Sequence, residues 1–286
     1  MSESTSPDAT LVITHGGCND GHTAAWLISL IDPGAEFVPA RHDEDPPDVT
    51  GRRVVMADFA YKRPVMEHLL TSCDSMLLLD HHQSAREDLA GLEHPALTAV
   101  FDMDRCGSRI VMDHFADELR DALGPRRWEL AQQFVAYIDD RDRWVRALPK
   151  TDEWSAGLAS HDMTFESWSA MAFGDQNSLI SDGEAIERYR MQRVDLAVER
   201  AIEAEIAGHL VLVSNCDPGV VSEVGARLAV GRPFSACYID MSDSRRWSLR
   251  STDDGVDVAH LAERFGGGGH PRAAGFRTDR DSWPVG

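Results

Sequence analysis

The segment that most constrains the fold of this chain is Leu77–His82, with the sequence LLLDHH. A short apolar run of this kind is typical of a buried strand, and it ends in one carboxylate and two imidazoles. Alternating α/β folds place their ligand-binding groups at the carboxyl ends of parallel strands. Aspartate and histidine together suit divalent transition metals. The segment therefore predicts a sheet strand that leads into a metal or catalytic site, rather than a solvated polar loop.

Three further apolar runs in the first half of the chain end in potential ligands. With the residues that follow them, they are Leu11–Thr14 before His15, Val54–Ala57 before Asp58, and Phe134–Ile138 before Asp139 and Asp140. The third run has its apolar residues at helical spacing, so it predicts the end of a helix rather than of a strand. Four ligand-rich ends on an alternating strand and helix pattern predict an α/β domain with one shared site.

These motifs resemble those of the DHH phosphoesterases, a family named for the triplet that stands here as Asp80-His81-His82. Near the other end of the chain, Phe265–Phe276 is similar to the glycine-rich substrate motif of the DHH-associated domain, and Trp247–Ser251 matches the usual run-up to it. The resemblance covers nearly the whole chain. It implies an α/β fold with an N-terminal, mainly parallel sheet covered by helices on both faces, a linker helix and a smaller C-terminal mixed α/β domain. The active site would lie in the cleft between the two domains.

Three segments follow from this pattern: a DHH catalytic domain over residues 1–150, a helical connector over 151–207 and a DHH-associated substrate-binding domain over 208–286. Glu184–Ala207 contains no glycine or proline and predicts a long linker helix. His209–Ser214 predicts the strand that opens the second domain. Phe234–Asp240 and Arg246–Ser251 predict a strand pair joined by a polar turn.

The resemblance also implies the metal chemistry. In this family two divalent ions lie between the strand ends, share a bridging carboxylate and activate a water that attacks phosphorus. Mn²⁺ is expected first, with Co²⁺, Zn²⁺, Fe²⁺ and Mg²⁺ as alternatives. Asp58 would bridge the ions. The remaining ligands would be Asp20, His81 and Asp140 at one site and His15 at the other.

Two choices within these motifs stay open. Asp140 has an aromatic residue four positions later, as related members often do, but Asp142 is an alternative ligand and Asp139 could be only a solvated helix end. His82 would donate a hydrogen bond to a phosphate oxygen or orient a ligand. Asp80 would support a histidine, because ligating imidazoles usually give their other N–H to a carboxylate or carbonyl.

The first motif departs from the common family pattern. Many members have two aspartates separated by one residue; here Asp20 is the second, and Cys18 stands in place of the first, a variation that some members share. A thiolate is a softer ligand than a carboxylate, so Cys18 as a metal ligand would shift the preference of its site towards zinc or iron. The alternative is that Cys18 packs without binding metal and water fills the vacancy.

The glycine run Gly266–Gly269 is costly to place in regular structure, because glycine loses the most backbone entropy on folding. Its value is close approach of backbone N–H groups to an anion. We therefore expect Gly267, Gly268 and Gly269 to bind substrate, with His270 donating to a phosphate or a base.

Arg250 could clamp a terminal phosphate through its planar guanidinium. Arg245, Arg246 and Arg272 are weaker candidates for the same role.

The net charge of the chain restricts the class of substrate that we expect. The formal net charge is -20, with 28 basic and 48 acidic residues. Such a chain should repel long nucleic acids unless its groove is locally basic, so a short nucleotide is the expected partner and a long duplex is not. The five cysteines are widely spaced without a CxxC pair, and no signal peptide or bilayer-spanning run is evident. These features favour a cytoplasmic protein without membrane partners; a homodimer would follow family habit.

The leading hypothesis is a metal-dependent phosphohydrolase of di- to oligonucleotides or of 3′-phosphoadenosine 5′-phosphate, an oligoribonuclease-like activity. The alternatives are a single-strand 5′–3′ exonuclease, an inorganic pyrophosphatase and a non-catalytic nucleotide sensor. The glycine-rich C-terminal motif argues against the pyrophosphatase, and Cys18 is the feature that favours the sensor. A zinc deaminase is excluded, because the chain has no His-x-Glu with a Pro-Cys-x-x-Cys partner.

Overall fold

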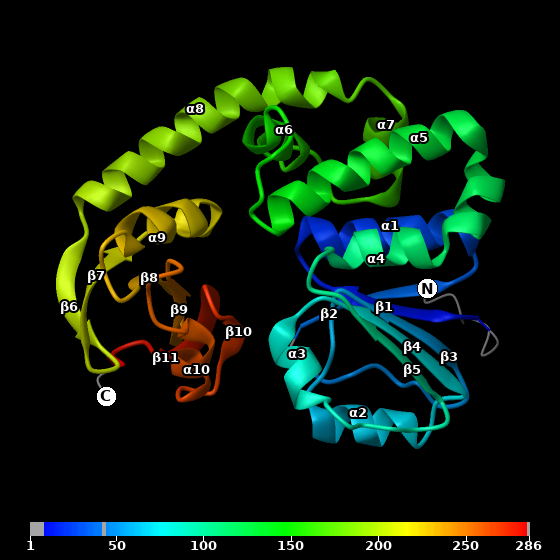
Figure 1. The fold of residues 1–286 in the computed structure, drawn as a ribbon, viewed down its shortest axis with the longest axis horizontal. Coiled ribbons are helices and arrows are strands. Elements are labelled where there is room, and N and C mark those ends of the chain that lie inside the picture. Colours follow the sequence, from blue (N-terminus) through cyan, green and yellow to red (C-terminus); the bar gives the residue numbers. More distant parts are fainter. Residues whose placement is uncertain (1–8, 42–43, 285–286) are drawn as a thin grey trace. The chain divides into compact units, whose positions relative to one another are not determined.

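The computed structural model describes residues 9–41 and 44–284, and the chain divides into two compact units, residues 1–186 and 187–286 (Figure 1). Each unit is built on its own sheet. The first sheet is entirely parallel, and the second is mixed. The predicted fold class, a parallel α/β domain followed by a smaller mixed α/β domain, is confirmed.

The first sheet has five strands in the order β2-β1-β3-β4-β5. They are β1 (Leu11–His15), β2 (Glu36–Ala40), β3 (Arg53–Ala57), β4 (Ser75–Asp80) and β5 (Leu97–Phe101). The order reverses between β1 and β3, where Leu11 lies opposite Val54 and Thr14 lies opposite Ala57. Doubly wound sheets bind their ligands at the carboxyl ends of the strands beside such a reversal. The strand order alone therefore directs attention to His15 and Asp58.

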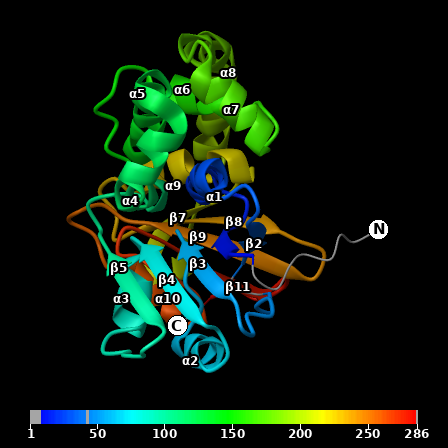
Figure 2. The same cartoon turned by 90° about the vertical axis from the view of Figure 1, so that its right-hand side faces the viewer.

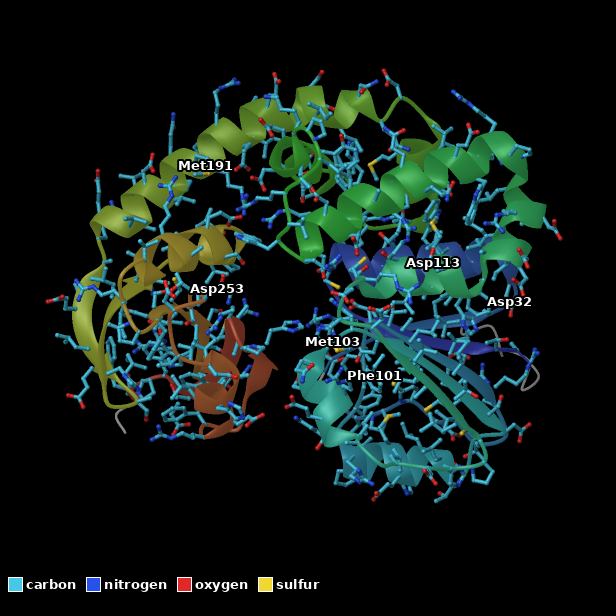
Figure 3. The ribbon with its side chains drawn as sticks, in the orientation of Figure 1. Asp32, Phe101, Met103, Asp113, Met191 and Asp253 are labelled. Atoms are coloured by element: carbon cyan, nitrogen blue, oxygen red, sulfur yellow. The ribbon has the colours of Figure 1, made fainter. Side chains whose placement is uncertain are left out.

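Helices cover both faces of this sheet (Figures 1 and 2). One face packs on α1 (Asn19–Ile31), α4 (Gly107–His114) and α5 (Ala116–Asp142), and the other on α2 (Arg63–Leu70). The short helix α3 (Gln83–Asp88) follows β4. Alternate strand residues serve the two faces: Val12 belongs to the core under α1, and Ile13 belongs to the core over α2. Figure 3 shows side chains filling the space on both sides of the sheet.

Three more helices follow α5: α6 (Thr151–Leu158), α7 (Phe165–Phe173) and α8 (Asn177–Glu199). The helix α5 is interrupted by Gly124, whose φ of 68° lies in the left-handed region, just before Pro125. The segment after this break carries Phe134, Val135 and Ile138 into the core, as the helical spacing predicted.

The second unit holds a six-stranded sheet in the order β10-β11-β9-β8-β7-β6. Its elements are β6 (Ile202–Ile206), β7 (His209–Asn215), the 3-10 turn Pro218–Val220, α9 (Val221–Ala229), β8 (Ser235–Asp240), β9 (Ser244–Arg250), α10 (Val258–Glu263), β10 (Gly268–His270) and β11 (Ala273–Asp279). One face buries Trp247, Leu249 and Phe276 against α10. The other buries Cys237 against α9 and the end of α8. The predicted strand pair appears as β8 and β9.

The linker helix is shorter than predicted at its carboxyl end. It ends at Glu199, and Ile202–Ile206 forms an edge strand instead of a helix. This segment has strong helix formers, but its alternating sequence IEAEI pairs with β7, and Ile206 is fully buried. Pairing and burial outweigh intrinsic propensity here. No helix in the described part of the chain is long and apolar enough to cross a bilayer.

Candidate metal centre

The turn after β1 folds back on His15 and delivers Asp20 to the sheet edge. Cys18 is the N-cap of α1, and its Sγ accepts a hydrogen bond from the Gly21 N–H at 3.2 Å. A Cβ on Gly21 would lie 2.4 Å from the carbonyl oxygen of His15, so only glycine permits this approach. Asp20, in the first turn of α1, is 2% exposed.

Asp58 follows β3 in a strained conformation. Its φ of 57° lies in the left-handed region, which a residue with a Cβ seldom adopts. Its N–H donates to the Leu79 carbonyl at 2.9 Å, and its side chain is 2% exposed. A Cβ on Gly107 would come within 2.4 Å of the Asp58 Cβ. The backbone therefore holds the Asp58 carboxylate in one position, packed against the start of α4.

The amino end of α4 supports Asp20. The backbone N–H groups of Gly107 and Ser108 donate to its two carboxylate oxygens, at 2.7 and 2.8 Å. A helix N-terminus stabilises a negative charge through these otherwise unsatisfied N–H groups. The sequence analysis missed this contribution, because backbone donors leave no signature in residue type.

His81 joins the two carboxylates. Its Nε2 lies 3.1 Å from Asp58 Oδ1, 3.7 Å from Asp20 Oδ2 and 3.6 Å from Asp142 Oδ2. The imidazole is 6% exposed. One histidine nitrogen thus faces three carboxylates that come from α1, the end of β3 and the end of α5.

Asp142, not Asp140, lies in this cluster. The Asp140 carboxylate points the other way and accepts the N–H groups of Ala147 and Leu148 at 2.8 and 3.1 Å, together with the Thr151 hydroxyl. It is 5% exposed, and its hydrogen bonds hold the loop after α5. The structure therefore favours the alternative that the sequence left open. Asp142 is the better candidate ligand, and Asp140 stabilises the loop after α5.

A second trio shares Asp58. Cys18 Sγ lies 3.2 Å from Asp58 Oδ2 and 3.6 Å from His15 Nδ1, and His15 Nδ1 lies 3.7 Å from the same carboxylate oxygen. Burial, together with the charges of Asp58 and Asp20, raises the pKa of the Cys18 thiol well above its ordinary value. Asp58 thus stands between a group with His81 and a group with His15, which is the arrangement that a bridging carboxylate requires.

His82 and Asp80 form a pair beside these groups. Asp80 is fully buried, and one of its oxygens lies 2.7 Å from His82 Nδ1 while also accepting the His81 N–H at 2.8 Å. Burial opposes the charged imidazole, but the contact with Asp80 outweighs it and raises the pKa of His82 to about 10. The contact with Asp80 therefore favours the charged form of this imidazole, whose side chain is 26% exposed.

The acids of the cluster shift in opposite directions. Burial, with the charge of Asp58, raises the pKa of both Asp20 and Asp142. Burial also opposes ionisation of Asp58, but hydrogen bonds with His15 and His81 outweigh it and lower its pKa. Carboxylates this close together repel one another unless one is protonated or a cation lies between them. The ligand atoms of three overlapping groups lie within 4.8 Å of one another: His15, Cys18 and Asp58; Asp58, His81 and His82; Asp20, His81 and Asp142. These donor types fit divalent transition metals.

The predicted substrate-binding residues lie in the second unit, and three of them, Arg250, Gly268 and His270, lie on one face of its sheet. The strand register places His270 opposite Ala273, Ala273 opposite Arg250, and Arg250 opposite Ser235. Residues paired in this way point to the same side of a sheet, so His270 and Arg250 share a face. Their strands are two inter-strand spacings apart, which is about 9.6 Å. The small residue Ala273 lies between them.

Arg250 is the arginine best placed to meet an anion. Its guanidinium donates to the Leu249 carbonyl and to the Ser222 hydroxyl, both at 2.9 Å, and burial lowers its pKa. Within the described residues it forms no ion pair. Of the weaker candidates, Arg272 donates to carbonyls of the loop 253–256 and Arg245 pairs with Asp240.

The four glycines differ in what the fold requires of them. Gly266 and Gly269 have φ values of 77° and 143°, and a Cβ on Gly267 would lie 2.0 Å from the Gly275 carbonyl oxygen. Gly268 has no positive φ, and a Cβ added there would meet nothing within 4 Å. Two of the glycines belong to the short strand β10, so the run is partly regular structure rather than a free turn. Gly268 is the one whose small size the fold itself does not explain.

No protein-family model matches the chain. It is 27% identical over 293 residues to an uncharacterized protein of Acanthamoeba polyphaga mimivirus. This match covers 93% of this chain and 66% of that protein. It is 30% identical over 129 residues to the oligoribonuclease NrnB of Bacillus subtilis. This match covers 45% of this chain and 31% of NrnB. The matches thus span less than two thirds of either relative.

Three solved structures have a similar fold. RecJ of Thermus thermophilus in complex with Mn²⁺ has a TM-score of 0.57 at 15% identity, covering 96% of this chain and 50% of RecJ. An exopolyphosphatase-related protein of Bacteroides fragilis scores 0.56 at 11% identity, with coverages of 94% and 86%. A pGpG-specific phosphodiesterase of Vibrio cholerae scores 0.50 at 13% identity, with coverages of 95% and 94%. At sequence identities of 11–15%, these likenesses show a shared fold and no more.

Proposed function

We propose that this protein is a DHH-type phosphoesterase that uses divalent metal ions to hydrolyse phosphoester bonds of short nucleotides. The observation that carries the proposal is the position of Asp58, whose carboxylate lies 3.1 Å from His81 Nε2 and 3.2 Å from Cys18 Sγ. It is therefore shared by the group of Asp20, His81 and Asp142 and the group of His15 and Cys18. Both groups stand at the carboxyl ends of β1, β3 and β4.

The residues would divide the work as follows. Two nearby cations, when bound, would lower the pKa of a shared water and neutralise charge on the phosphoryl oxygens. Asp58 would bridge them. The α4 N–H groups of Gly107 and Ser108 keep the Asp20 carboxylate oriented before any ligand arrives. His82, held in place by Asp80, would donate a hydrogen bond to a phosphoryl oxygen.

Cys18 is part of this proposal as a ligand. Its thiol points at Asp58 and His15, and a bound cation would favour the thiolate that burial now disfavours. A thiolate would make this half of the site better suited to Zn²⁺ or Fe²⁺, whereas the oxygen-rich half with Asp20 and Asp142 suits Mn²⁺ or Mg²⁺.

A short substrate fits the charge of the chain. A net charge of -20 opposes the binding of a long polyanion, whereas one or two anchors suffice for a dinucleotide. Arg250, Gly268 and His270 would supply such an anchor in the second unit. Two similar proteins carry short-nucleotide activities in their names, the oligoribonuclease NrnB and the pGpG-specific phosphodiesterase.

The test is a size series assayed with Mn²⁺: a 5′-phosphorylated dinucleotide, a pentanucleotide, a long single strand and 3′-phosphoadenosine 5′-phosphate. We expect turnover confined to the short substrates and abolished by chelator. His81→Ala should remove the activity, and His68→Ala, at an exposed position on α2, should retain it. Preferred digestion of the long strand would indicate an exonuclease instead. No turnover with any substrate in a folded protein that binds the dinucleotide would indicate a sensor.

A further inference from the structure

Trp144 is an exposed aromatic residue next to the metal-ligand cluster. Its exposed fraction is 37%, whereas Trp26, Trp154, Trp168 and Trp247 are at most 1% exposed. It belongs to none of the apolar clusters of the described residues. It follows Asp142 by two positions, so the two Cα atoms are at most about 7.6 Å apart. The backbone of Trp144 is therefore close to Asp142, and its ring does not contribute to the core.

The backbone around Trp144 is strained. Trp144, Arg146 and Lys150 have φ values of 61°, 54° and 62°, in the left-handed region. A bulky aromatic residue in this region is an outlier, and such strain persists only where surrounding contacts impose it. Strain of this kind is concentrated at binding and catalytic sites.

Asp140 imposes this conformation. Its backbone carbonyl accepts the N–H groups of Val145 at 3.0 Å and Arg146 at 3.3 Å. Its buried carboxylate accepts the next two N–H groups and the hydroxyl of Thr151. Five contacts from one residue thus hold the loop after α5. A loop ordered in advance loses less entropy on binding a ligand, so it can hold one more tightly.

Two arginines lie on the indole ring. The guanidinium carbons of Arg141 and Arg146 are 4.3 and 3.7 Å from its centroid. The Nε atoms of both arginines also approach one oxygen of Asp152, at 3.6 and 2.9 Å. The Asp152 carboxylate offsets one of the two positive charges, and the flat guanidinium and indole groups offer stacking surfaces to a planar ring. Nucleobases stack on aromatic rings and on arginine planes.

We infer that Arg141, Trp144 and Arg146 form a stacking subsite for the nucleobase of the nucleotide whose phosphate lies at the metal-ligand cluster. The inference rests on the proposed function and adds to it the requirement for a base beside the reacting phosphate. Asp140 acts as a positioning residue for this subsite. Phosphoesters without a nucleobase would lack this contact.

The test compares Trp144→Ala with wild type on a 5′-phosphorylated adenine dinucleotide and on two analogues of it. In each analogue one of the two adenosines is replaced by a ribose that lacks a base. Stacking of one base contributes about 1–3 kcal/mol, which corresponds to roughly 5- to 140-fold in affinity. We expect KM for the intact dinucleotide to rise by a factor in this range, with kcat little changed. KM for one abasic analogue should be the same in both proteins. Trp144→Phe should recover most of the affinity, and Val145→Ala, in the same loop and 51% exposed, is the matched control.

An equal rise in KM for the intact dinucleotide and for both analogues would overturn the inference, since it would mean that Trp144 only supports the loop. Unchanged kinetics of Trp144→Ala on all three substrates would overturn it as well. Calorimetric titration with adenosine 5′-monophosphate and with ribose 5-phosphate gives a readout that does not depend on turnover. If wild type hydrolyses nothing but binds the adenosine compound through Trp144, the subsite stands and the proposed phosphoesterase activity fails. If Trp144→Ala binds both compounds as wild type does, the subsite fails.

Discussion

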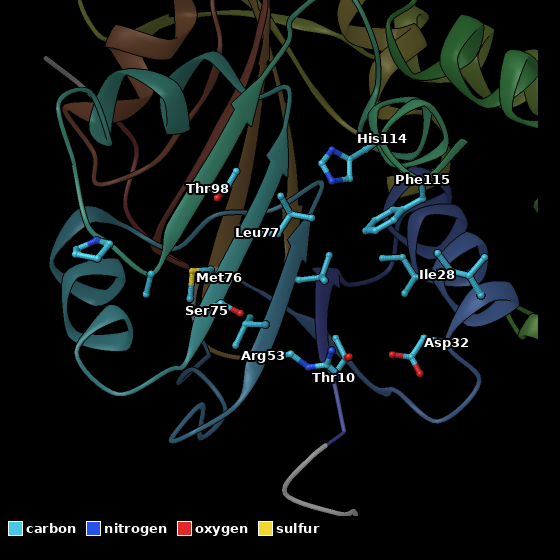
Figure 4. Close-up of a pocket in the computed structure, with 15 residues that line it drawn as sticks. Thr10, Ile28, Asp32, Arg53, Ser75, Met76, Leu77, Thr98, His114 and Phe115 are labelled. Carbon is cyan, nitrogen blue, oxygen red and sulfur yellow. The ribbon is translucent and has the colours of Figure 1, made fainter. Parts of the chain in front are cut away.

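The two ends of the first sheet have different chemistry. At the carboxyl ends, Asp58 and His81 are buried together with Asp20. At the amino ends lies a pocket of about 560 Å³ between β3–β5, the end of α1 and the end of α4 (Figure 4). Its walls are mainly apolar and include Val55 and Leu77. Every group of three potential metal ligands among the described residues lies at the carboxyl ends. This pocket is therefore not the candidate site.

Helix direction explains this difference. The amino ends of α1 and α4 point their free N–H groups at the carboxyl ends of the strands, and Gly107 and Ser108 use theirs on Asp20. The opposite ends of the same helices, near Ile31 and His114, border the pocket. Carbonyl groups there disfavour buried carboxylates. The topology of the sheet therefore locates its chemistry.

The largest expected effect is at Asp58. Asp58→Asn removes the carboxylate that both ligand groups share, so turnover should fall by about 10³-fold or more, as when a member of a catalytic unit is lost. Calorimetry should show the loss of at least one bound Mn²⁺. Asp117→Asn, at a side chain that is 93% exposed, is the matched control. Full activity in Asp58→Asn would break the distinction between the two ends of the sheet.

The next prediction concerns two aspartates at the carboxyl end of the first sheet, which we expect to have different roles. Asp142→Asn should weaken Mn²⁺ binding by about 10- to 100-fold with little change in unfolding free energy. Asp140→Asn should instead cost about 1–3 kcal/mol of unfolding free energy, because it weakens the hydrogen bonds of a buried acceptor. Titration calorimetry and urea denaturation of the two variants measure both quantities. The reverse outcome, with metal affinity lost in Asp140→Asn alone, would restore Asp140 as the ligand.

A smaller effect is expected from a single methyl group at Gly107. Its Cβ would lie 2.4 Å from the Asp58 Cβ, so Gly107→Ala must displace that carboxylate. We expect Mn²⁺ affinity to fall by about 10-fold, the lower end of the range for disturbed ligand support. Gly34→Ala, at the amino end of the sheet and with its nearest contact at 3.8 Å, should leave the affinity unchanged. Equal affinities for the two variants would show that Asp58 tolerates movement.

The smallest effects are expected around the amino-end pocket. Arg53→Ala and His114→Ala alter two polar residues that line it, and both should leave kcat/KM within about twofold of wild type. Steady-state kinetics on the dinucleotide measure this directly. A drop of ten-fold or more in either variant would mean that the pocket takes part in the reaction after all.

Much of the first unit could be predicted from its sequence. The runs ending at His15, Asp58 and Asp80 each combine strand-forming residues with ligands, and parallel strands must bring such ends together. Asp20 was implied by the family resemblance of the first motif, and the structure brings it to the same edge through the turn between β1 and α1. These predictions rest on local pattern plus one topological rule. Whether the residues bind metal stays a prediction.

Other features depend on geometry that residue types do not encode. The choice between Asp140 and Asp142 depends on where α5 ends and how its last turn is rotated, and a shift of two residues turns a helix position by about 200°. The N–H groups of Gly107 and Ser108 are backbone donors that any sequence possesses. The strand Ile202–Ile206 forms because β7 offers a partner, although its residues favour a helix.

Anomalous diffraction at the manganese edge, from crystals grown with Mn²⁺, tests the central claim most directly. The account predicts manganese bound to Asp20, Asp58, His81 and Asp142, with any second ion on the His15 side of Asp58. Manganese coordinated by Asp140, manganese in the amino-end pocket, or no anomalous peak at these carboxylates at saturating Mn²⁺ would contradict it.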